Sequence, residues 1–288
     1  MSITDEAWDA YSSGDLDRAA REAMKALNRD PDVADARVVL AHVLTARGET
    51  ARAEALLREA VAAAERTLAL AYDPRGQYAF WSDLSTRPYM RARYALVEAL
   101  DRRGEVELAI EHAREILRLC PRDNMGVRYL LLSMLIRESP RAVERAVLWH
   151  FPVYTGEEDG PREFYGDSLL LWARTTPRGN ADCEQTTAEA LVRHHPLSTE
   201  ALLVGLGARL PSRADRAAVS PSNQAMRHTA EQEAAQVLPF WKPGGAERVR
   251  VLRQAYAAAV QRARRSGGRL TFGPLDDIYG RDDLRPFD

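Results

Sequence analysis

The chain has 288 residues and a formal net charge of −2, so no overall basic field favours nucleic acid as a partner. Hydrophobic residues make up 45% and charged residues 28%, which is typical of a globular protein with a sizeable core. Cys120 and Cys183 lie far apart and form no CxxC pair, which fits a reduced, cytoplasmic compartment. The N-terminal residues predict no signal peptide. The longest apolar run, 129–136, is too short to cross a membrane.

Three glycines, Gly14, Gly48 and Gly104, begin the same pattern of small and apolar residues. Gly14 and Gly48 are 34 residues apart, and a proline stands 17 residues after both Gly14 and Gly104 (Pro31 and Pro121). A glycine suits a tight turn between two helices, and small residues let the helices approach closely. The fixed offsets hold Ala19, Ala23, Ala26 and Leu27; then Ala53, Leu57, Ala60 and Val61; then Ala109, Ala113, Ile116 and Leu117.

This period, with glycine in the inter-helix turn, resembles the tetratricopeptide repeat. Between Gly48 and Gly104 the spacing is 56 residues, so about 22 residues are inserted into the array. The best-formed unit follows the insertion, because Thr86 can cap a helix, Pro88 suits its first turn, and Gly104 ends it. Two such helices cannot bury their apolar faces alone, which predicts stacked neighbours.

Taken in chain order, the pattern predicts an all-α fold, a right-handed α-α superhelix with a C-terminal helical cap. A fourth unit has Ser139-Pro140 in place of the turn glycine. A fifth spans 168–196, and within it Gly179 and Pro196 repeat the spacing of 17 residues. The predicted organisation is repeats over 1–209, with an insert at 68–85 and a loop at 151–166; capping helices over 210–267, among them helices at 225–238 and 246–265; and an irregular tail at 268–288.

The insert at 68–85 carries aromatic residues that include Tyr78 and Trp81. One interpretation is that these side chains pack on the next repeat. The other is that the insert overhangs a groove and that Tyr78 and Trp81 contact a ligand, because loops on rigid scaffolds often carry function. A small-molecule or enzymatic pocket near Trp81, Tyr94 and Trp149 is an alternative on the same observation.

Two motifs, TRPYMRARYALVEAL (86–100) and PRDNMGVRYLLL (121–132), resemble bacterial tetratricopeptide proteins related to the suppressor-of-tumorigenicity-seven family. The later segments HHPLSTEALLVG (194–205) and AEQEAAQVLPFWKPGGAERV (230–249) are similar to that family's closing part. The resemblance implies a helical-repeat protein without catalytic activity. The positions that match in the closing part are Glu233, Ala234, Trp241, Gly245 and Ala246.

The sequence gives no sign of catalysis or of a cofactor. Nucleotide-binding glycine motifs, the GxSxG nucleophile motif and the HExxH metal motif are all absent. The neighbours His194 and His195 would point about 100° apart on a helix, which does not suit a shared metal ion. We therefore expect no enzyme, no metal site and no cofactor.

Groove-lining positions of a tetratricopeptide array are the best candidates for function, because the resemblance places the first helix of each unit on the concave face. Arg91 and Arg128 could grip a carboxylate in two-point fashion. The alternative is that these arginines form internal salt bridges with Glu98, Asp101 or Asp123. The predicted partner-binding residues are Asp35, Val38, His42, Arg91, Tyr94, Glu98 and Arg128.

These observations predict a protein–protein interaction scaffold or adaptor that holds an extended peptide or partner helix in its concave groove. The partner would be another protein or peptide, with no membrane partner. Nucleic-acid binding is a second alternative, because the predicted helix at 246–265 and its flank are rich in arginine. Those arginines are Arg248, Arg250, Arg253, Arg262, Arg264, Arg265 and Arg269.

Overall fold

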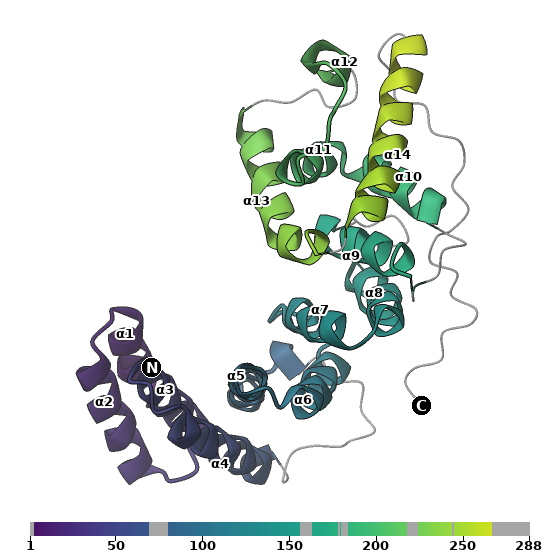
Figure 1. The fold of residues 1–288 in the computed structure, drawn as a ribbon. Helices are drawn as coiled ribbons and strands as arrows, with labels where there is room; N and C mark the ends of the chain where they lie inside the picture. Colours follow the sequence, from purple (N-terminus) through teal and green to yellow (C-terminus); the bar gives the residue numbers. More distant parts are fainter. Residues whose placement is uncertain are drawn as a thin grey trace. The chain divides into compact units, whose positions relative to one another are not determined.

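The computed structural model describes residues 3–68, 80–155, 163–177, 179, 184–217, 224–243 and 245–266. Over these ranges the chain forms α-helices α1 to α14 and one short 3-10 helix, with no strand (Figure 1). The predicted all-α fold class is therefore confirmed. The chain divides into two compact units, Met1–Met134 and Leu135–Asp288, and each is described by itself. Tyr78 and the predicted tail at 268–288 lie outside the described residues.

Unit 1 is built from consecutive helix pairs (Figure 1). Within each pair the helices pack on each other, and each pair packs on the next one along the chain. This is the stacking that the repeat spacing predicts. The helices are α1 (Asp5–Ser12), α2 (Leu16–Arg29), α3 (Ala34–Ala46), α4 (Thr50–Leu68), α5 (Arg87–Arg103), α6 (Val106–Leu119) and the start of α7 (Val127–Glu138), with the 3-10 helix η1 (Phe80–Ser82) before α5.

The turns inside the pairs share one backbone geometry. Gly14, Gly48 and Gly104 all have φ of +82°, a left-handed conformation that suits glycine and strains other residues. At Gly104 the turn is closed by two backbone hydrogen bonds, from Gly104 N–H to Asp101 O at 3.0 Å and from Glu105 N–H to Leu100 O at 2.9 Å. These bonds satisfy the last carbonyls of α5.

Alanine fills the close contacts between the helices of unit 1. Ala7 and Ala10 on α1 and Ala19 and Ala23 on α2 are each 0% exposed, and Ala36 of α3 joins the same apolar cluster. A methyl side chain allows helix axes to approach at the short end of the usual 8–10 Å range. The small residues at fixed offsets thus act as the close-packing positions of the repeat.

A buried acid joins the second pair to the third. Glu54 of α4 is 4% exposed. It accepts hydrogen bonds from Arg58 Nε, at 2.9 Å, and from Arg103 Nη1 of α5. Because a buried carboxylate is costly unless paired, this contact specifies how α4 and α5 meet.

Unit 2 is also helical, and α7 spans the division between the units. Within it α9 packs on α8, α10 and α13, while α14 packs on α10, α11 and α12. None of the helices in the described residues is both long and apolar enough to span a membrane. Its remaining helices are α8 (Pro140–Thr155), α9 (Phe164–Arg174), α10 (Glu184–His194), α11 (Pro196–Gly205), α12 (Arg213–Ala217), α13 (Gln224–Trp241) and α14 (Ala246–Arg265).

Several expectations for unit 2 need correction. The predicted loop at 151–166 is too long, because α8 continues to Thr155 and α9 begins at Phe164. Within the expected capping region 210–267, the short helix α12 precedes the two helices expected there. In contrast, α14 has the predicted bounds. The prediction that repeats end at residue 209 and capping helices follow stays a prediction.

Gly179 does not repeat the turn of Gly14 and Gly104, since it is not among the described glycines with positive φ. Its N–H donates to Thr176 O at 2.6 Å. A Cβ at this position would lie 1.6 Å from the carbonyl oxygen of Ala173. Gly179 is therefore required for close backbone packing after α9, although its spacing from Pro196 copies that of the earlier units.

Gly104→Ala should lower the free energy of unfolding by about 1–2 kcal/mol, the cost of a left-handed non-glycine residue. No heavy atom lies within 4 Å of the position that a Cβ would take, so the cost comes from the backbone alone. Urea unfolding of both variants measures it. Gly104→Asn is the matched control and should lose less, because asparagine tolerates this conformation better. Equal stability of wild type and Gly104→Ala would contradict this account of the turn.

Candidate functional site

The first helices of the three pairs in unit 1, α1, α3 and α5, lie side by side, since α3 contacts both α1 and α5. We call the surface that they share the A-helix surface and define it by five partly exposed side chains. These are Trp8, Tyr11, His42, Tyr94 and Glu98.

An aromatic cluster occupies the α1–α3 end of the A-helix surface. The rings of Tyr11 and His42 stack, with centroids 5.3 Å apart and planes 23° apart. Trp8 lies 5.9 Å from His42 and 6.3 Å from Tyr11. Burial lowers the pKa of His42, and the nearby positive charge of Arg102 adds to the effect. The imidazole is therefore a neutral ring at physiological pH, suited to stacking.

The α5 end of the surface is polar and partly desolvated. Burial raises the pKa of Glu98, and the charge of Arg102 offsets part of that rise. Burial also raises the pKa of Tyr94, with further contributions from Glu98 and Asp123. A carboxylate held in a poorly hydrated place costs stability, so Glu98 is an unfavourable residue for the fold alone.

Arg91 and Asp35 form a two-point ion pair across α5 and α3. Arg91 Nε donates to Asp35 Oδ1 at 2.8 Å, and Arg91 Nη2 donates to Asp35 Oδ2. Asp35 is 6% exposed. The guanidinium fork that was expected to grip a ligand carboxylate thus already holds one from its own chain. This internal partner is none of the three acids considered from the sequence.

Arg128 is committed to the start of α7. It is 2% exposed, and its Nε lies 3.6 Å from Asp123 Oδ2. Asp123 also accepts hydrogen bonds from the backbone N–H groups of Val127 at 2.7 Å and Arg128 at 3.0 Å. The Arg128 guanidinium carbon lies 5.1 Å from the centre of the Tyr129 ring. These contacts are those of an internal salt bridge, the alternative interpretation of Arg128.

The predicted partner-binding residues therefore fall into three groups. His42, Tyr94 and Glu98 lie together on the A-helix surface. Val38, at 1% exposed, belongs to the core and offers no surface to a ligand. The ion-paired residues Asp35, Arg91 and Arg128 have structural partners.

Trp8 and Tyr11 of the surface were missed from the sequence. A signal was present, because Trp8 stands 34 residues before His42, one repeat earlier. Asp35 and Arg91 are likewise 56 residues apart, the spacing of the inter-helix glycines Gly48 and Gly104. Equivalent positions in adjacent repeats meet across the stacked first helices.

The described end of the insert packs against the beginning of α5. Phe80 is 3% exposed and lies 6.1 Å, ring to ring, from Tyr89. Arg87 lies 4.9 Å from the centre of the Trp81 ring and donates from Nε to Trp81 O at 2.9 Å. Trp81 is thus a packing residue on its described contacts. The rest of the insert with Tyr78, and the side chain of Trp149, lie outside the described residues.

The closing motif of the sequence joins α11, α13 and α14 of unit 2. Ser198 of α11 donates a hydrogen bond to Glu233 of α13, and Trp241 is fully buried at the end of α13. A Cβ on Gly245 would lie 2.3 Å from Trp241 O, so only glycine fits the turn into α14. These residues have structural roles.

The arginines of α14 are engaged within unit 2 in several cases. Arg248 lies 5.3 Å from the centre of the Trp172 ring, Arg250 pairs with Glu247, and Arg264 lies 3.0 Å from Asp215. The described residues hold no group of three or more His, Cys, Asp or Glu side chains that could bind a metal ion.

Comparison with known proteins agrees with the geometry of unit 1. Residues 10–74 match a family model described as tetratricopeptide repeat, and residues 64–124 match a second model of the same description. A search of curated proteins found no match. The helix pairs, the recurrent glycine turns and these two matches identify residues 10–124 as tetratricopeptide repeats.

Proposed function

We propose that the A-helix surface of unit 1 binds an extended peptide segment of a partner protein. Tetratricopeptide repeats generally mediate protein–protein interaction. The observation that carries the proposal is the aromatic stack of Tyr11 and His42, 5.3 Å apart, followed on α5 by the half-buried Tyr94 and Glu98.

The surface has the chemistry that an extended segment requires. Aromatic faces provide contact area at low entropic cost. The hydroxyl of Tyr94 and the carboxylate of Glu98 are able to bond the peptide N–H groups that a strand without a neighbouring strand leaves free. A segment along α1, α3 and α5 would therefore meet apolar contacts first and polar partners second.

A ligand carboxylate is not needed for this mode of binding. Arg91 would have to release Asp35, its two-point partner, before it could hold another acid, and Arg128 is buried with Asp123. We place the recognition at Trp8, Tyr11 and His42 instead.

We further propose that the protein is a cytoplasmic adaptor without enzymatic activity, related to the bacterial proteins of the suppressor-of-tumorigenicity-seven type that its motifs resemble. The structural roles of Glu233, Trp241 and Gly245 support the comparison, because they explain why a closing motif would need these residues. No contact of the described residues favours the alternative pocket near Trp81 or nucleic-acid binding by α14.

Glu98→Gln should raise the melting temperature at pH 7 and weaken partner binding. The pKa of Glu98 is raised by burial, so the folded chain holds this proton more tightly than the unfolded chain. Protonated Glu98 therefore stabilises the fold fully at pH values below its ordinary pKa of 4.5. This stabilisation is lost as the pH rises through the raised pKa of the folded chain. The gain from glutamine should therefore vanish below pH 4.5.

Thermal unfolding of both proteins between pH 4 and pH 8 measures this difference. Lower stability of Glu98→Gln at pH 7 would show that the carboxylate serves the fold, and the argument that Glu98 is kept for binding would then fail.

A photo-crosslinking amino acid at Tyr94 should capture a discrete partner from an extract of the source cells. Tyr94→p-benzoylphenylalanine places the reactive group on the A-helix surface. The control is the same replacement at Leu108, which is 40% exposed on α6. Mass spectrometry of the products should show one segment of a partner joined at position 94 and absent at position 108.

Identical products at the two positions, or none at position 94, would contradict peptide binding on the A-helix surface. Circular dichroism of both variants confirms that the helices are retained, so the result concerns binding alone.

A further inference from the structure

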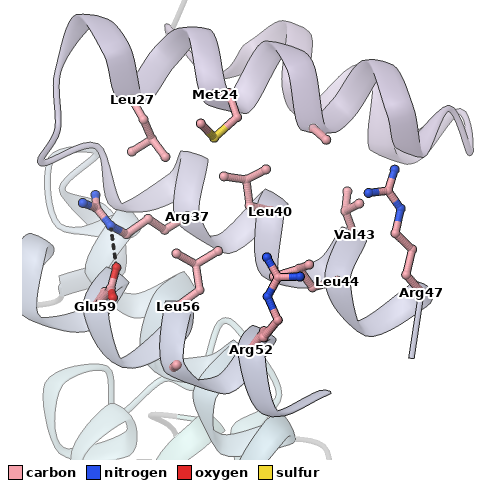
Figure 2. Close-up of a pocket in the computed structure, with 12 residues that line it drawn as sticks. Met24, Leu27, Arg37, Leu40, Val43, Leu44, Arg47, Arg52, Leu56 and Glu59 are labelled. Atoms are coloured by element: carbon pink, nitrogen blue, oxygen red, sulfur yellow. Dashed lines mark ion pairs between the residues drawn. The ribbon is translucent and has the colours of Figure 1, made fainter. Parts of the chain in front are cut away.

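A second concave feature of unit 1 lies between α2, α3 and α4, and its lining does not include His42 (Figure 2). Its volume is about 480 Å³. Along α3 its lining residues recur at intervals of three and four, from Arg37 through Leu40 and Leu44 to Arg47. We call this feature the α2–α4 groove. It takes no part in the proposed function of the A-helix surface and does not depend on it.

The floor of the groove is apolar and partly open to solvent. Met24 of α2 is 49% exposed, and Leu27, Leu40 and Leu56 around it are partly exposed. Figure 2 shows these four side chains facing the space between the three helices. Methionine adapts its shape to different apolar partners, which makes it frequent on binding surfaces.

Charges at the rim are unevenly distributed. At one end Arg37 Nε lies 3.7 Å from Glu59 Oε2, so the two lining charges there cancel. Toward the other end the lining carries Arg47 and Arg52 and no acid. The side chains of these two arginines are 42% and 74% exposed. Among the described residues they pair with acids outside the lining, the exposed Asp17 and the partly exposed Glu49. Such exposed pairs contribute little and are readily exchanged for a partner's carboxylates.

The lining of the groove favours a helical over an extended backbone in a bound segment. The interiors of α2, α3 and α4 use their N–H and C=O groups in their own helices, and the floor between them is apolar. An extended strand would bury its own polar backbone groups there without partners, which is costly. A helix satisfies them internally. The strip from Arg37 to Arg47 covers eleven residues of α3. Its length is roughly 15 Å, that of about three turns of a partner helix.

We infer that the α2–α4 groove receives an amphipathic helix of a partner protein, with apolar residues at helical spacing on one face and acidic residues toward the end that lies beside Arg47 and Arg52. The apolar face covers Met24 and Leu40, and the acids replace Asp17 and Glu49 as partners of the arginines. A concave groove of this kind fits a helix better than it fits a flat membrane surface.

A display library of helical peptides with randomised surface positions, selected on the full-length protein, tests this inference. The enriched peptides should carry Leu, Ile, Met or Phe at positions i, i+3 or i+4, and i+7, with Asp or Glu near one end. Fluorescence anisotropy of the synthetic peptides should show binding weakened about tenfold or more by Met24→Asp, as expected for loss of a central apolar contact. Arg47→Glu/Arg52→Glu should also weaken binding.

Met226→Asp is the matched control, because Met226 has the same 49% exposure as Met24 but lies on α13 of unit 2. It should leave binding unchanged. Peptides that bind Met24→Asp as tightly as wild type, or a selection that enriches no such pattern, would overturn the inference. A third outcome would also overturn it. If the selection enriches no peptide, and vesicles of phosphatidylserine and phosphatidylcholine bind the wild type but not Met24→Asp, the groove binds a membrane surface and not a helix.

Discussion

Close packing of alanine against alanine is the constraint on which unit 1 depends. Ala7, Ala10, Ala19 and Ala23 leave no space between α1 and α2 for larger side chains, so the larger side chains lie on the faces of the stack. On one side they form the aromatic cluster of Trp8, Tyr11 and His42. Elsewhere on the stack Met24 and four leucines line the α2–α4 groove. One packing rule thus produces two surfaces with different chemistry, one suited to an extended segment and one to a helix.

The fold of unit 1 could be predicted because its signals are local. Each turn needs a glycine that adopts φ of +82°, and a proline follows the second helix. The fixed separation of these two residues can be read directly from the sequence. The same reasoning failed at Gly179, where glycine is required by a close contact with the carbonyl of Ala173. Spacing cannot distinguish a glycine needed for its dihedral angles from one needed for lack of a side chain.

The candidate site was only partly predictable. The position of a residue within the repeat indicates the helix face on which it lies, but it does not indicate which side chain it contacts. The repeat register assigned His42 and Glu98 to the same face of the array. It could not show that the guanidinium of Arg91 pairs with Asp35. For Arg128 it left open the choice between a ligand carboxylate and the internal acid Asp123, which the structure shows as the partner. Both arginines are charged residues at positions expected to be exposed. Asp35 of α3 comes near Arg91 of α5 only when the helices stack, which is tertiary information. Asp123 stands five residues before Arg128 and was among the acids considered from the sequence.

Hydrogen–deuterium exchange of the full chain, with and without the partner segment identified by crosslinking, shows which helices the partner covers. Binding on the A-helix surface slows local opening of the helices that it contacts. We expect added protection in α1, α3 and α5, with little change in α6 or in the helices of unit 2. Protection confined to α11, α13 and α14, with none in the first helices of unit 1, would contradict it.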